Sequence, residues 1–128
     1  EGRANVVSVG SAGNERQITN VAAGTSPTDA VNLSQLQGLD AALRNGISQV
    51  SKKASAGTAS AIASGNLLQA TVPGKGMVSI SGGHYDGQSA IALGVSKMSD
   101  NGKWVVKVGA SIDSQDKVGA SAAVGFHF

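Results

Sequence analysis

Apolar side chains alternate with small or polar ones through most of the second half of the chain, which is the period of a β-strand. The pattern occupies residues 76–85, 89–98, 103–112 and 117–128. Short runs rich in Asp, Asn, Gly and Ser separate these segments and predict turns. The sequence therefore predicts a four-stranded antiparallel meander, whose strands have the length of about ten residues that a tilted strand needs to cross a bilayer.

The two faces of the predicted strands differ in an unusual way. One face is bulky and apolar, and it comprises Val78, Ile80, Ile91, Leu93, Val95, Trp104, Val106, Val108, Ile112, Val118, Val124, Phe126 and Phe128. The opposite face is small and polar, with Gly94 among its members. A soluble sandwich would place charged residues on its second face. A membrane β-barrel instead turns bulky residues to lipid and small polar ones to the lumen.

The period changes to three and four residues in the preceding segment, 29–72, which predicts a helix. Its apolar positions form a narrow stripe typical of a coiled-coil core, and they are Leu33, Leu36, Leu43, Ile47 and Val50. Asp40 falls on this stripe, and taking Leu39 instead implies a shift of phase before Ile47. The sequence 26–29, Ser-Pro-Thr-Asp, predicts the helix start, and Pro73 with Gly74 predicts its end.

Small residues replace the bulky stripe in the second half of this helix. Gly57, Ala61 and Gly65 recur at every fourth position, which allows helices to approach closely. A flexible alanine and serine linker is the alternative interpretation. Residues 1–28 mix β-branched residues with glycine and small polar ones, which favours short strands and turns.

Four strands are too few to close a barrel. Their edges would be left unpaired in hydrocarbon, and the smallest membrane barrels have about eight strands. Two copies would give eight strands and a lumen filled by side chains, whereas three give twelve and leave room for helices. The sequence therefore predicts a homotrimer with a 12-stranded barrel, through which three helices with small side chains pass.

Composition and charge exclude several other classes of function. The formal net charge is +2 with 14% charged residues, which is too weak a field to indicate a nucleic-acid partner. No cysteine is available for thiolate chemistry, and no run of 18 apolar residues predicts a transmembrane helix. The chain opens on Glu1 without an initiator methionine, so we expect it to be the C-terminal piece of a longer precursor.

No motif in the chain indicates catalysis. His84 and His127 lie on different predicted strands without a cluster of acids, so we expect no metal site. The sequence Gly-Lys-Gly at 74–76 lacks the spacing of a phosphate-binding loop, and no serine has the G-x-S-x-G context of a nucleophile. We therefore expect neither an enzyme nor a cofactor.

Three stretches resemble one known family. "ERQITNVAAGTSPTDAVNLSQL" (15–36) closely resembles the neck of trimeric autotransporter adhesins of the YadA type, and "SVGSAGNERQI" (8–18) resembles the head repeat before it. The four strands ending in Phe128 resemble the membrane anchor of that family. The resemblance divides the chain into head and neck (1–28), coiled-coil stalk and lumen helix (29–72) and anchor (73–128).

This resemblance implies a function. It implies a homotrimer in the outer membrane of a Gram-negative bacterium, which exports its own passenger by type V secretion and then tethers it. The expected partners are outer-membrane lipid, the barrel-assembly machinery and a host surface or matrix ligand bound by an upstream head. The alternatives are a soluble adhesin fragment and an open porin.

The resemblance also implies roles for single residues. Phe126 and Phe128 resemble the terminal signal read by the assembly machinery. Gly94 matches a lumen-facing glycine of the second strand on which passage of the helix depends. In the neck, Arg16 and Asn20 are expected to form a clamp between chains, with simple solvation as the alternative.

Overall fold

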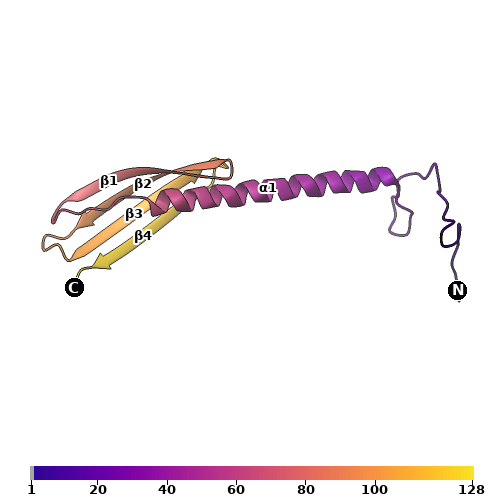
Figure 1. Cartoon of the computed structure of the whole chain (residues 1–128), viewed down its shortest axis with the longest axis horizontal. Helices are drawn as coiled ribbons and strands as arrows, with labels where there is room; N and C mark the ends of the chain where they lie inside the picture. Colours follow the sequence, from indigo (N-terminus) through magenta and orange to yellow (C-terminus); the bar gives the residue numbers. More distant parts are fainter. Residues whose placement is uncertain (1) are drawn as a thin grey trace. The chain divides into compact units, whose positions relative to one another are not determined.

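The computed structural model describes residues 2–128, which contain one helix and four strands (Figure 1). The elements are the helix α1 (Leu33–Gly65) and the strands β1 (Gly76–Tyr85), β2 (Gln88–Met98), β3 (Trp104–Asp113) and β4 (Val118–Phe126). The chain forms two compact units, one that ends at Arg44 and one that begins at Asn45, and α1 spans the boundary.

The four strands form one antiparallel sheet in the order β1-β2-β3-β4, which confirms the predicted meander. Asp86 and Gly87 connect β1 to β2, and their φ angles of 45° and 76° match the two-residue hairpin turns whose twist suits paired strands. Among residues 2–128, β1 and β4 each have a strand neighbour on one side only. The sheet therefore has two free edges.

The predicted division of the sheet into two faces is confirmed. In β2, burial alternates along the whole strand, with Ala92 and Ser96 buried and Leu93 and Val95 exposed between them. The buried face lies under the last turns of α1 (Figure 1). No helix or strand of residues 2–128 covers the bulky face, so Leu93 keeps 57% of its surface exposed. Bulky side chains point outward and small ones point toward the helix.

The predicted helix start was wrong, because α1 begins at Leu33 rather than at residue 29. Asn32 and Gln35 form a capping box, in which Gln35 N donates to Asn32 Oδ1 (3.1 Å) and Asn32 N donates to Gln35 Oε1 (3.2 Å). Asp29 instead closes a turn by accepting hydrogen bonds from the backbone N–H groups of Thr25 and Ser26. These two bonds lower the pKa of Asp29, so the turn loses their support as the pH falls through that lowered value.

The Gln35 side chain also joins the neck to the helix. Its Nε2 donates to Gly24 O and its Oε1 accepts from Gly24 N, both at 3.0 Å, and Asn32 Nδ2 donates to Val21 O at 3.1 Å. Residues 21–24 are thus held beside the first turn of α1. These hydrogen bonds keep Asn32 as the capping residue of α1, because a helix that started elsewhere would break them.

The predicted helix end was also wrong, since α1 ends at Gly65 and residues 66–75 are not helical. Side chains of the sheet form hydrogen bonds with the backbone of residues 67, 68 and 70, and these replace the hydrogen bonds that further helical turns would make. The predicted coiled-coil residues all lie within α1 and are exposed, with Ile47 at 70% and Leu43 at 58%. Asp40 pairs with Arg44 at 2.9 Å on the helix surface.

Replacing Asn32 by alanine should destabilise the start of α1 by about 1 kcal/mol, because the N–H of Gln35 loses its acceptor. Circular dichroism of the full chain in detergent micelles, followed against temperature, measures the change. Ser34→Ala is the matched control, since Ser34 lies inside the capping box but makes neither of its hydrogen bonds. Equal melting curves for the two variants would contradict the role of the box.

Candidate functional site

The last turns of α1 lie on the sheet through an alanine face. Ala56, Ala59 and Ala63 have no exposed surface, and their spacing of three and four places them on one side of the helix. Opposite them, Gly83 of β1 comes so close that a Cβ there would lie 2.8 Å from Ala63 N and would also collide with Ala59 O. The helix backbone therefore approaches the sheet at a distance that only glycine allows.

The predicted row of small residues lies on a different side of α1. Gly57 and Ala61 are exposed, and each stands two positions from Ala59, or about 200° around the helix. A Cβ at Gly57 or Gly65 would have no neighbour within 4 Å among the described residues. This face continues the spacing of Ile47 and Val50, so the stripe of the stalk extends toward the end of α1 with small side chains.

The segment after the helix is bonded to the sheet through its backbone. Four side chains on the buried face of β1, β2 and β3 take part. Ser81 Oγ donates to Ala63 O, Lys107 Nζ to Leu67 O (3.2 Å) and Ser79 Oγ to Leu68 O (3.1 Å), and Ser96 Oγ accepts from Ala70 N (2.7 Å). The bond to Ala63 O lies in the last turn of α1, and the other three satisfy backbone groups of the non-helical residues 67–70. A lysine beside the C-terminal end is also favoured by the helix dipole.

Gly94 lies on the helix-covered face, as its position in the strand predicted. Its neighbour, however, is Leu67, which stands two residues beyond the end of α1. A Cβ at Gly94 would lie 3.0 Å from Leu67 Cδ1, and a Cβ at Gly109 would lie 2.8 Å from the same atom. Of the residues at this contact, Gly94 was predicted from the sequence, whereas Gly83, Gly109 and Leu67 were not. The signal available for the two glycines was their position on the same face as Gly94.

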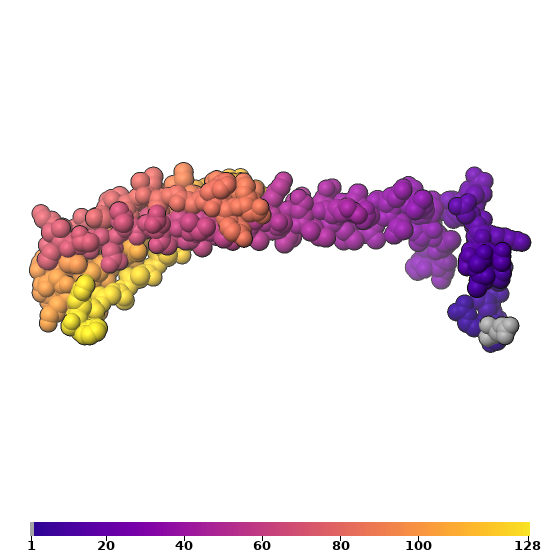
Figure 2. Space-filling view, viewed as in Figure 1, coloured from indigo at the N-terminus to yellow at the C-terminus, as the bar shows by residue number. Residues whose placement is uncertain are grey.

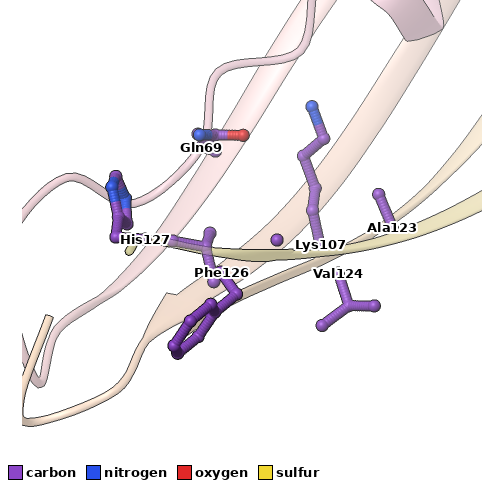
Figure 3. Close-up of a pocket in the computed structure, with 8 residues that line it drawn as sticks. Gln69, Lys107, Ala123, Val124, Phe126 and His127 are labelled. Atoms are coloured by element: carbon purple, nitrogen blue, oxygen red, sulfur yellow. The ribbon is translucent and has the colours of Figure 1, made fainter. Parts of the chain in front are cut away.

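The inner face of β4 is open. Figure 2 shows this strand, in yellow, as a strip at the edge of the sheet that the helix does not cover, and its small residues Ser121, Ala123 and Gly125 are exposed. A cavity of about 290 Å³ lies beside it, with Gln69, Lys107 and His127 on one side of the strand and Phe126 on the other (Figure 3). Each chain therefore leaves a strip of small residues uncovered.

The ends of the described chain hold the remaining predicted residues. The ring of Phe126 packs against that of Trp104 with centroids 4.7 Å apart, and Phe128 is fully exposed. In the neck, Arg16 and Asn20 are exposed, and Asn20 has a φ of 60° and lines a cavity of about 480 Å³.

The chemistry of the described residues is that of packing and hydrogen bonding. Within residues 2–128, no group of three or more His, Asp and Glu is placed to hold a metal ion. In the same range, no helix combines the length and the apolar character that a membrane-crossing helix requires.

Gly83→Ala should prevent the helix from lying against β1, because its new methyl group would meet backbone atoms that cannot move aside. We expect a loss of folded protein in detergent and faster cleavage of residues 45–65 by protease. Gly82→Ala is the control on the neighbouring position, where a Cβ would meet only Ala90 O at 3.8 Å. Equal protease resistance in the two variants would show that the close approach is not needed.

Comparison with known proteins assigns the chain. Residues 17–59 match the coiled stalk of trimeric autotransporter adhesins, and residues 68–128 match the YadA-like membrane anchor domain. The chain is 46% identical over 112 residues to the autotransporter adhesin NhhA of Neisseria meningitidis serogroup B, covering 88% of this chain and 19% of that protein. It is 40% identical over 135 residues to the autotransporter adhesin EhaG of Escherichia coli O157:H7, covering 97% of this chain and 8% of that protein.

The chain thus spans less than a fifth of the length of these relatives. Its match is to the membrane-anchored end of an adhesin and includes both the stalk and the anchor. These relationships place it in the outer membrane and at the cell surface of a Gram-negative bacterium. The chain belongs to the family of YadA-like trimeric autotransporter adhesins.

Proposed function

We propose that three copies of this chain form the outer-membrane anchor and the type V export pore of a trimeric adhesin. Their sheets close into one 12-stranded barrel, the three helices run inside it, and the passenger stays tethered through the stalk. The observation that carries this proposal is a sheet with two free edges and an exposed apolar face.

Free edges are the strongest argument for closure between copies. In hydrocarbon, an unpaired backbone N–H or C=O costs several kcal/mol, because no water is present to bond it. Pairing β1 of one copy with β4 of the next removes both edges of each sheet. Two copies would give eight strands, whose interior side chains fill, whereas three give twelve and a lumen able to hold helices.

The two faces of α1 support the presence of three helices in that lumen. Its alanine face lies on its own sheet, and its opposite face, with Gly57 and Ala61, is exposed among the described residues. Small side chains on this second face allow helix backbones to approach closely. Upstream, the same stripe becomes bulky at Ile47 and Val50, as a coiled-coil core outside the barrel requires.

The outer face supports contact with lipid. Val78 and Ile80 are 76% and 70% exposed. The tilted rings of Trp104 and Phe126 pack together where β3 begins and β4 ends, and membrane proteins favour aromatic residues near such strand ends. Exposed Phe126 and Phe128 then serve as the signal for the barrel-assembly machinery. A soluble fragment would leave this apolar face in water, which argues against that alternative.

An open porin is also disfavoured. The end of α1 and residues 66–70 occupy the inner face of β1, β2 and β3, and they are bonded to it. The lumen is thus filled by the exported chain after secretion. In the neck, we propose that Arg16 and Asn20 hydrogen-bond to neighbouring chains, and that a head beyond this stalk binds the host ligand.

Cysteine cross-linking tests closure of the barrel. The chain has no cysteine, so engineered pairs are the only thiols. We expect Ile80→Cys with Val124→Cys, or Val78→Cys with Ala122→Cys, to give a covalent trimer on oxidation in outer membranes. Within one copy these outward positions are three strand spacings apart, about 14 Å, which is too far for a disulfide.

Leu93→Cys with Val124→Cys is the control, since Leu93 lies on an inner strand of the sheet and stays unlinked when edges pair. Trimers that also resist mild heating in detergent would strengthen the result. Monomers alone, in all combinations of Val78 or Ile80 with Ala122 or Val124, would overturn the closed barrel.

A further inference from the structure

Leu67 fills a depression in the sheet. Gly94 and Gly109 are direct partners in the register of β2 and β3, and neither has a side chain to cover the backbone there. The side chain of Leu67 enters this gap and keeps only 5% of its surface exposed. Leu68, the next residue, is 68% exposed and points away from the gap. We name Gly94 and Gly109 the Leu67 seat.

Hydrogen bonds hold the backbone on either side of the same residue. Lys107 bonds Leu67 O, Ser79 bonds Leu68 O and Ser96 bonds Ala70 N. The two serines are almost completely buried, with 9% and 2% of their surface exposed. This short segment is therefore fixed by its side chain and by its backbone together.

The alanine face of α1 cannot fix its own position along the sheet. Ala59 and Ala63 are four residues apart, so a shift of the helix by one turn would bring one of these alanines to the position of the other. From residue 56 to 70, the buried apolar residues are Ala56, Ala59, Ala63, Leu67 and Ala70. Leu67 is the one bulky member of this row. Its fit into the gap adds a bulky contact that belongs to the observed register, beside the hydrogen bonds from Lys107, Ser79 and Ser96.

We propose that Leu67 and its seat form an axial stop, which determines where the exported chain comes to rest in the barrel. This inference rests on the proposed export function. During export, the small side chains of α1 slide past the sheet, and movement ends when Leu67 enters the gap between Gly94 and Gly109. The bonds from Ser79, Ser96 and Lys107 then form and hold the tethered end.

The register is measurable, because Ser55 Oγ donates to Asp86 Oδ2 at 3.2 Å in the resting position. Asp86→Cys is combined in separate proteins with Ser51→Cys, Ser55→Cys or Ala59→Cys, which sample the resting register and a shift of one turn either way. A short thiol cross-linker is applied to the full chain in outer membranes. Mass spectrometry of the linked peptides gives the yield of each pair.

With Leu67 present, we expect the yield of the position 55 cross-link to be about tenfold higher than the yields at positions 51 and 59. Loss of a buried leucine typically costs more free energy than a tenfold ratio of populations requires. Leu67→Ala should bring the three yields close together, and Leu68→Ala should leave them unchanged. If Leu67→Ala fails to assemble, Gly94→Ala serves instead, because its Cβ would lie 3.0 Å from Leu67 Cδ1 and would narrow the gap without removing Leu67. Gly82→Ala is its control.

A strong preference for position 55 that persists in both Leu67→Ala and Gly94→Ala would overturn the stop. The edge cross-links between β1 and β4 are measured in the same membranes. If they form while the helix register is unaffected, the stop is wrong and the barrel stands. If they do not form even with Leu67 present, the proposed export pore itself is wrong.

Discussion

Close approach between a helix backbone and a sheet backbone governs the second unit of this chain. At Gly83 the two backbones meet at a distance that excludes even a methyl group, and the alanines of α1 complete the contact. Such a contact has a cost in stability. Each buried methyl contributes only about 0.8 kcal/mol, far less than a leucine core would. The helix therefore lies close to the sheet, but the contact between them buries little apolar surface and stabilises the fold only weakly.

Polar side chains on the sheet offset part of this weakness. Serine and lysine residues of β1, β2 and β3 bond the backbone where α1 ends, so groups that would otherwise be buried without partners are satisfied. These bonds are directional, whereas contacts between alanines are not. The small polar face therefore contributes specificity of position more than it contributes burial. The opposite, bulky face is left to interact with the surroundings of the sheet.

The sequence predicts the four strands of the sheet well and the helix ends poorly, for physical reasons that differ. The short strands favoured within residues 1–28 were wrong, since residues 2–28 hold only an isolated bridge between Ser11 and Asn14. Alternation along β2 is strict, so its two faces are visible in the sequence. The helix start is ambiguous, because Ser26 with Asp29 and Asn32 with Gln35 have similar capping patterns. Contacts of Gln35 with Gly24, distant in sequence, decide between them.

The helix end depends on the sheet in the same way. Residues 66–72 have no strong helix breaker before Pro73, yet Ser79, Ser96 and Lys107 bond their backbone in an extended form. The position of the helix end also determines that Gly83 contacts α1, whereas Gly94 and Gly109 contact Leu67. The position of Gly94 in its strand identified it as inward-facing. It could not show whether Gly94, Gly83 or Gly109 makes the closest contact with the helix.

In the proposed trimer, the surfaces that one chain leaves open would pair with different surfaces of its neighbours. The helix exposes a face with Gly57 and Ala61, and β4 exposes an inner face of glycine, serine and alanine. The sheet exposes one edge at β1 and another at β4. Surfaces that differ but match lead to head-to-tail association, which either continues indefinitely or closes into a ring. The proposed barrel requires the ring, and three helices inside it would limit how many copies can share one axis.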